Sequence, residues 1–149
     1  MSDKAGLRRA YNEPSGLYKH GNVLHVAGAK SLSDAWDDLK LPLIKTSLTQ
    51  RYKDANEVLK HNPGITAISG HSLGGAVALE LQKENPKLQV TTYGAPVVSF
   101  TQSENRFRNL GDPISGLDFG TNTVRDTRGS LNPLTAHGYQ NFNNVTETN

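Results

Sequence analysis

The sequence predicts a single α/β domain with a mostly parallel central sheet, and two observations lead to this prediction. Short runs rich in β-branched residues alternate along the chain with longer segments of helical periodicity. The spacing leaves room for one helix between successive strands, which implies parallel pairing with right-handed crossovers, and we expect helices on both faces of the sheet. The 149 residues suit one domain over 1–149, in which about 141–149 form a polar tail.

The first half of the chain contains one predicted strand and one predicted helix. Residues 22–27 form a short, partly β-branched run between two glycines and predict a strand. After Pro42, apolar residues recur every three or four positions and predict an amphipathic helix, which Asn62-Pro63-Gly64 ends. The residues of this apolar face are Ile44, Leu48, Tyr52, Ala55 and Leu59.

The second half continues the alternation and then becomes less regular. Residues 65–69 predict a second strand, and the segment from Leu73 to about Glu84, rich in Ala and Leu, predicts a helix. Residues 88–93 predict a third strand. Further on, 106–110 and 122–125 are expected to be short strands between turns rich in Gly and Asp.

The composition excludes several classes of protein. Hydrophobic residues make up 35% of the chain, and no apolar run is long enough to cross a bilayer. The chain starts without the hydrophobic stretch of a signal peptide, so we expect a soluble protein whose compartment stays open. The net charge is +2 and the basic residues are scattered, which argues against nucleic-acid binding. The absence of cysteine excludes disulfides and thiolate chemistry.

The segment Gly70-His71-Ser72-Leu73-Gly74 matches the GxSxG pattern and lies between a predicted strand and a predicted helix. Such a sharp turn projects the serine hydroxyl, and glycines two residues to either side avoid a collision. A phosphate-binding turn is the alternative, but Ala76 stands where the Walker pattern requires lysine. We therefore predict that Ser72 is a nucleophile.

A serine nucleophile needs a histidine base that a carboxylate orients, and in this turn context the chain order is Ser, Asp or Glu, His. His137 is the one histidine that follows both Ser72 and candidate carboxylates. Asp112 is the preferred carboxylate, because it begins a loop after a predicted strand; Asp118 is the reserve and Asp126 also lies in the interval. His71, His25 and His61 are expected to have structural roles.

Two backbone amides are candidates for an oxyanion hole. The N–H of Leu73 opens the helix after the nucleophile, where free amides and the helix dipole favour negative charge. The second donor should come from the loop after an earlier strand, and in Gly28-Ala29-Lys30-Ser31 the N–H of Ala29 is the preferred one.

These residues together resemble the class 3 lipases, the fungal triacylglycerol lipase type, whose relatives include phospholipases A1. The resemblance extends from about Val23 to Tyr139 in family order. It rests on Val26-Ala27-Gly28-Ala29-Lys30-Ser31 with Asp34, Trp36, Asp38 and Leu39, on Gly70 to Gly75, on Tyr93-Gly94-Ala95-Pro96-Val97-Val98, and on Asn109-Leu110-Gly111-Asp112-Pro113-Ile114 followed by His137 and Tyr139.

The resemblance implies a reduced α/β-hydrolase fold and a serine hydrolase of lipid esters, acting through Ser72, Asp112 and His137 and an acyl-enzyme, without metal or cofactor. The chain differs from the family pattern at Ala29, where the family has threonine, and it is shorter than typical members. Residues 39–44 are the candidate lid, and contact of this segment with a lipid interface is left open. A phospholipase A1 or lysophospholipase would share the catalytic residues. A catalytically inert module for lipid binding or assembly is the alternative from another class.

Overall fold

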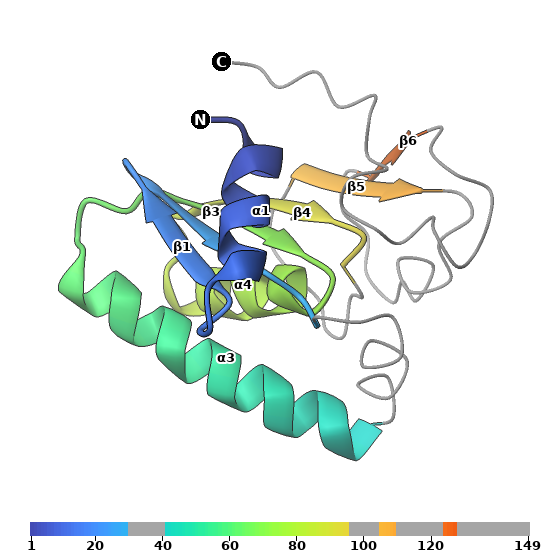
Figure 1. Cartoon of the computed structure of the whole chain (residues 1–149), viewed down its shortest axis with the longest axis horizontal. Coiled ribbons are helices and arrows are strands. Elements are labelled where there is room, and N and C mark those ends of the chain that lie inside the picture. The colour runs from blue at the N-terminus through green and yellow to red at the C-terminus, as the bar shows by residue number, and fades with distance from the viewer. Residues whose placement is uncertain (30–40, 96–104, 110–123, 128–149) are drawn as a thin grey trace.

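The structure, a computed structural model, describes residues 1–29, 41–95, 105–109 and 124–127. Within these ranges the chain is a small α/β domain (Figure 1). The helices are α1 (Asp3–Asn12), α3 (Leu41–His61) and α4 (Leu73–Glu84). The strands are β1 (Leu17–His20), β2 (Val23–Val26), β3 (Ala67–His71), β4 (Gln89–Tyr93), β5 (Asn105–Asn109) and β6 (Val124–Thr127).

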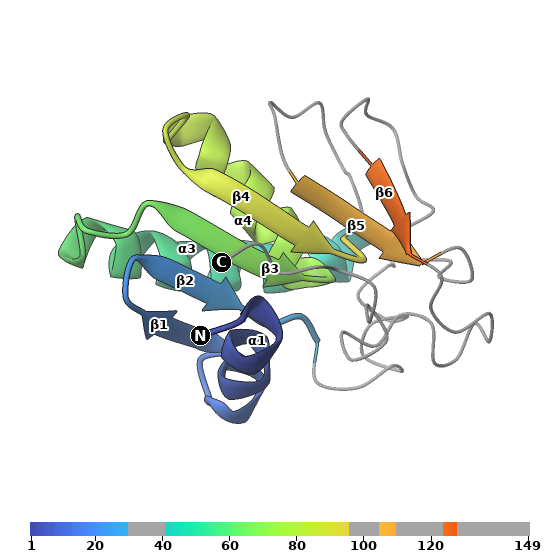
Figure 2. The same cartoon turned by 90° about the horizontal axis from the view of Figure 1, so that it is seen from above.

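The strands form one sheet in which spatial order equals chain order, β1-β2-β3-β4-β5-β6. β1 and β2 pair antiparallel as a hairpin, and every later neighbouring pair is parallel. The predicted mostly parallel sheet is therefore confirmed. The strand order never reverses, so right-handed crossovers bring α3 and α4 to the same face of the sheet. Figure 2 shows these two helices on one side of the strands and α1 on the other.

The face under α3 and α4 holds the main apolar core. Leu24 in β2 pairs in register with Ile68 in β3, which pairs with Val90 in β4, so all three side chains share this face. They pack with Val77 and Leu81 of α4 in one buried cluster. Because side chains alternate between the two faces along each strand, every second residue of a strand points into this core.

The opposite face, under α1, carries polar side chains. His25, Ser69 and His71 are buried there, and the carboxylate of Asp3 in α1 accepts a hydrogen bond of 3.0 Å from the Tyr93 hydroxyl. Gly6 lets α1 approach closely, since a Cβ at this position would lie 2.3 Å from the His25 ring. Among the described residues, the apolar cluster on this face is small and consists of Leu7, Tyr93 and Phe107.

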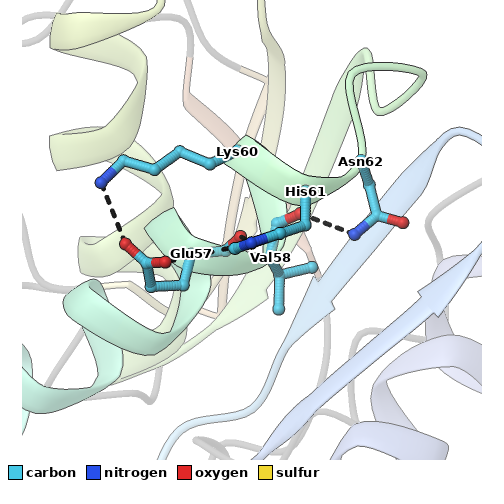
Figure 3. A network of polar contacts seen from close by, with 5 residues as sticks. All are labelled: Glu57, Val58, Lys60, His61 and Asn62. Atoms are coloured by element: carbon cyan, nitrogen blue, oxygen red, sulfur yellow. Dashed lines mark hydrogen bonds and ion pairs between the residues drawn. The ribbon is translucent and has the colours of Figure 1, made fainter.

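A set of exposed polar contacts marks the end of α3 (Figure 3). The Asn62 side chain donates to the Val58 carbonyl at 2.7 Å, and His61 Nδ1 lies 2.8 Å from the Glu57 carbonyl. Lys60 forms an ion pair with Glu57 at 2.9 Å and lowers the pKa of that carboxyl group. The Asn62 side chain thus satisfies the Val58 carbonyl, which belongs to the last turn and lacks an intrahelical partner.

The predicted boundaries need three corrections. The second strand begins at Ala67 and extends to His71, because the turn after α3 continues through Ile65, whose N–H donates to the Asn62 carbonyl. The first long helix begins at Leu41 and includes Pro42, since proline is tolerated in a first turn. Strands expected at 22–27, 88–93, 106–110 and 122–125 are shifted or shortened by one or two residues.

Helix α1 and strand β1 were not predicted. The buried face of α1 consists of Gly6, Leu7 and Ala10, so it has only one large apolar residue and no clear periodicity. β1 has four residues, of which only Leu17 is buried. Ser2 does cap α1, accepting a hydrogen bond from the Ala5 N–H at 3.3 Å, and Asp3 follows it in the first turn. A capping serine before an acidic residue was the available signal for this helix.

Candidate functional site

The candidate site is centred on Ser72, which joins the end of β3 to the start of α4. Its backbone has φ of 53° and ψ of −124°, and Ser72 is the one non-glycine with positive φ among the described residues. Such a conformation costs about 1–3 kcal/mol and persists only where the surroundings enforce it. Here the Ser72 N–H donates to the Tyr93 carbonyl at 3.0 Å, and the Ser72 carbonyl accepts from the Gly75 N–H at 2.9 Å.

The glycines around Ser72 are required by close contacts between backbones. A Cβ at Gly70 would lie 2.5 Å from the carbonyl oxygen of Gly74, so the strand and the helix could not approach as they do. A Cβ at Gly74 would lie 2.1 Å from the carbonyl oxygen of Val26 in β2. The first glycine therefore permits the turn itself, and the second permits packing of the turn against the neighbouring strand.

The Ser72 side chain does not act as an ordinary helix cap. Serine at this position usually accepts a hydrogen bond from an amide in the first turn, but Ser72 makes no such side-chain bond in α4. The amides of Leu73 and Gly74 precede the first hydrogen bond of α4, which Gly75 donates to the Ser72 carbonyl, and they lie at the positive end of the helix dipole. The turn thus combines a serine that is not used for capping with a set of backbone donors suited to an anion.

The segment after β2 meets the turn at Gly28. A Cβ at Gly28 would lie 2.8 Å from Ser72 Cβ and 2.8 Å from the His71 carbonyl oxygen. Only glycine fits between the two segments at this separation. Ala29, the predicted second oxyanion donor, follows directly and is partly buried.

Tyr11 of α1 connects these segments. Its hydroxyl oxygen accepts a hydrogen bond of 3.1 Å from the Gly28 N–H and lies 2.5 Å from His71 Nδ1. A hydroxyl has one donor and two acceptor positions, so both contacts are satisfied when His71 carries its proton on Nε2. His71 is buried beside Ser72 and takes part in this contact.

Arg51 of α3 reaches the same segment from the opposite side of the sheet. Its Nη1 donates to the Ala27 carbonyl at 3.2 Å. The guanidinium occupies the space that Gly16 leaves open at the end of the β1–β2 hairpin, where a Cβ would lie 1.4 Å from Nη1. The end of β2 is therefore bonded to side chains from α1 and from α3.

A second polar group under α1 involves His25. The His25 ring is almost fully buried, its Nδ1 lies 3.9 Å from the Asp3 carboxylate, and it stacks on Tyr18 with centroids 6.3 Å apart. Burial lowers the pKa of His25 below its ordinary value of 6.5, while the Asp3 charge acts in the opposite direction. His25 is therefore a neutral structural histidine near neutral pH.

The structure brings five of the predicted site residues into one region, namely Ser72, Leu73, Gly70, Gly74 and Ala29. The predicted base His137 and the carboxylates Asp112 and Asp118 lie outside the described residues. Asp126 falls in β6, at the far end of the sheet order from β1. The candidate lid 39–44 is described only from Leu41, where it forms the first turn of α3.

Sequence reasoning did not identify Tyr11 and Arg51. Tyr11 belongs to the helix that the apolar pattern does not reveal, and Arg51 is one of many scattered basic residues. Nothing in the local sequence of either residue indicates a contact with the end of β2. Both contacts follow from the packing of helices on opposite sides of one strand.

In the part of the chain that the structure describes, no group of three His, Asp or Glu side chains is arranged to hold a metal ion. Over the same residues, no helix has both the length and the apolar character needed to cross a membrane. No protein-family model matches the chain, and no curated protein or solved structure gives a significant match to it.

Proposed function

We propose that this chain is a serine hydrolase of the α/β-hydrolase type that cleaves carboxylic esters of lipids. The observation that carries the proposal is the backbone of Ser72, held at φ of 53° between a parallel strand and a helix. An ordinary tight turn could place glycine there without strain. A serine kept in this conformation, with glycines enforced on both sides, is the arrangement expected of a nucleophile elbow.

In the proposed reaction the Ser72 hydroxyl attacks the acyl carbonyl of the ester. His137 accepts the hydroxyl proton and then transfers it to the departing alcohol, while Asp112 orients His137. The amides of Leu73 and Ala29 stabilise the oxyanion of the tetrahedral intermediate. Water then attacks the acyl-enzyme by the same route, which releases the carboxylic acid and restores Ser72. The roles of His137 and Asp112 come from chain order and from the family resemblance.

The position of Ser72 supports the oxyanion part of this proposal. The turn lies at the carboxyl ends of β2, β3 and β4, where parallel sheets present functional groups. The N-terminus of α4 supplies amides on one side, and the segment at Gly28 approaches Ser72 on the other. Donors from two separate segments can therefore face one substrate oxygen.

The decisive experiment compares Ser72→Ala with Ser69→Ala. We expect Ser72→Ala to lose ester hydrolysis by about a thousandfold or more, because the nucleophile is removed. The matched control lies three residues earlier in β3; its buried hydroxyl has no hydrogen-bond partner among the described residues, so its loss should leave turnover unchanged. The assay uses p-nitrophenyl esters of short and long acyl chains, with His137→Ala measured alongside.

Labelling by a fluorophosphonate probe provides an independent readout, since it requires an activated serine and no particular acyl group. Wild type and Ser69→Ala should be labelled and Ser72→Ala should not. A phospholipid measured beside the ester series distinguishes a phospholipase from a lipase. If wild type neither reacts with the probe nor exceeds Ser72→Ala on any ester, the catalytic proposal is wrong and lipid binding without turnover becomes the better interpretation.

A further inference from the structure

One peptide unit at the end of β2 is bonded at both of its polar groups. The Ala27 carbonyl accepts from Arg51 Nη1 at 3.2 Å, and the Gly28 N–H donates to the Tyr11 hydroxyl at 3.1 Å. These two groups belong to the same planar peptide. Their partners come from α3 and α1, which lie on opposite sides of the sheet (Figure 2). Rotation of this peptide would break both hydrogen bonds at once.

The same contacts determine which amide can serve a substrate. The Gly28 N–H is directed to Tyr11, so it is not the amide that would face an oxyanion. The next amide along the chain is that of Ala29, and Ala29 has no polar side chain with which to orient the segment itself. Tyr11 also contacts His71, the residue before Ser72, so its hydroxyl links the oxyanion segment directly to the turn.

We propose that Tyr11 and Arg51 are positioning residues that orient the oxyanion-hole segment of this site. The inference rests on the proposed function, because it assigns a role toward the Ala29 donor. The Ala27–Gly28 peptide is held from both faces, so only rotation about the two backbone bonds of Gly28 can reorient the adjoining Gly28–Ala29 peptide. A donor fixed before the reaction stabilises an oxyanion without a cost of reorganisation. Neither side chain touches the reacting atoms in this role.

Tyr11→Phe is the primary test, because it removes one hydroxyl and preserves the ring. We expect kcat for a p-nitrophenyl ester to fall about tenfold with little change in KM, as loss of a whole oxyanion donor costs about a hundredfold or more. Arg51→Gln should have the same kind of effect. The double variant should lose less than the product of the two single losses, since both side chains hold one peptide.

The matched control is Asp3→Ala. Asp3 accepts a hydrogen bond from the Tyr93 hydroxyl at 3.0 Å, so this variant also removes one bond between α1 and the sheet. It does not alter a contact to Gly28. If Tyr11 serves only to hold α1 against the sheet, the two variants should reduce kcat equally. If Tyr11 orients the oxyanion segment, only Tyr11→Phe should reduce kcat.

A thionoester of the same acid gives a readout that loosened packing would not change. Its sulfur accepts hydrogen bonds weakly, so the ratio of ester to thionoester kcat/KM reports the oxyanion donors and does not depend on the fraction folded. We expect the ratio to fall about tenfold in Tyr11→Phe and to keep its wild-type value in Asp3→Ala. An unchanged ratio in Tyr11→Phe, with turnover that still depends on Ser72, overturns this inference alone. Absence of Ser72-dependent turnover in wild type overturns the proposed function and this inference together.

Discussion

The two faces of the sheet are built from different kinds of interaction, although each strand contributes alternate residues to both. Under α3 and α4, Leu24, Ile68 and Val90 pack in a continuous apolar cluster. Under α1, the corresponding positions hold polar residues such as His25 and Ser69. One face is stabilised by apolar burial, and the other by a few directed contacts and a close approach of backbone to side chain.

The difference follows from the strand order. Successive parallel strands added in one direction bring their crossover helices to one face, so that face receives the long helix and the most apolar helix. The remaining face is covered by α1, which is ten residues long and contributes Leu7 and Ala10 to the interior. A small helix buries little apolar area, and specific polar contacts then determine where it lies.

The largest expected effect is on the free energy of unfolding, when a buried leucine is shortened on one face or on the other. Leu81→Ala opens a cavity in the α3 and α4 core and should lower the free energy of unfolding by about 4–5 kcal/mol, while Leu7→Ala under α1 should cost about 2–3 kcal/mol. Urea denaturation measures both values. Equal losses would mean that the two faces contribute equally to stability.

The next effect compares two helix glycines that pack against β2. A Cβ at Gly74 meets the Val26 carbonyl, whereas a Cβ at Gly6 meets the ring of His25. A backbone cannot move aside as a side chain can, so Gly74→Ala should cost about 3 kcal/mol and Gly6→Ala about 1–2 kcal/mol. Thermal unfolding gives both differences. A larger loss for Gly6→Ala would show that α1 is the more rigidly held helix.

The smallest expected effect is a loss of stability at acid and at alkaline pH, caused by one titratable group on each face of the sheet. The lowered pKa of His25 means that the unfolded chain binds this proton more readily, so stability should fall as pH decreases below 6.5. Burial, together with a hydrogen bond to Glu84, raises the pKa of Tyr52 to about 12, so stability should fall as pH increases from 10 toward 12. Melting temperatures of His25→Gln and Tyr52→Phe should lose the acid and the alkaline dependence respectively; retention of either would contradict its assignment.

The two faces also differ in how well the sequence predicts them. The α3 and α4 face could be predicted, because Tyr52, Ala55 and Leu59 recur at helical spacing and the strands are short β-branched runs. α1 could not, because glycine and alanine at the interface leave no apolar period to detect. Close packing through small residues stabilises a helix without marking it in the sequence.

The candidate site is predictable in its local part only. The spacing of Gly70, Ser72 and Gly74 predicts a strained turn, and the backbone of Ser72 has the positive φ that such a turn requires. The contacts of Tyr11 and Arg51 depend on how two helices pack on one strand, and no local pattern encodes that geometry. The expected roles of Asp112 and His137 stay predictions.

The hydrogen bonds of α1 also determine when this helix can reach its final contacts during synthesis of the chain. Tyr11 contacts a residue 60 positions later, and the Asp3 bond to Tyr93 spans 90 positions. α1 is synthesised before β3 and β4, so it has no partner for these two bonds until those strands have been made. Until then Tyr11, which bonds to the Gly28 N–H, lacks its contact with His71, so the segment at Gly28 reaches its final arrangement only after β3 exists.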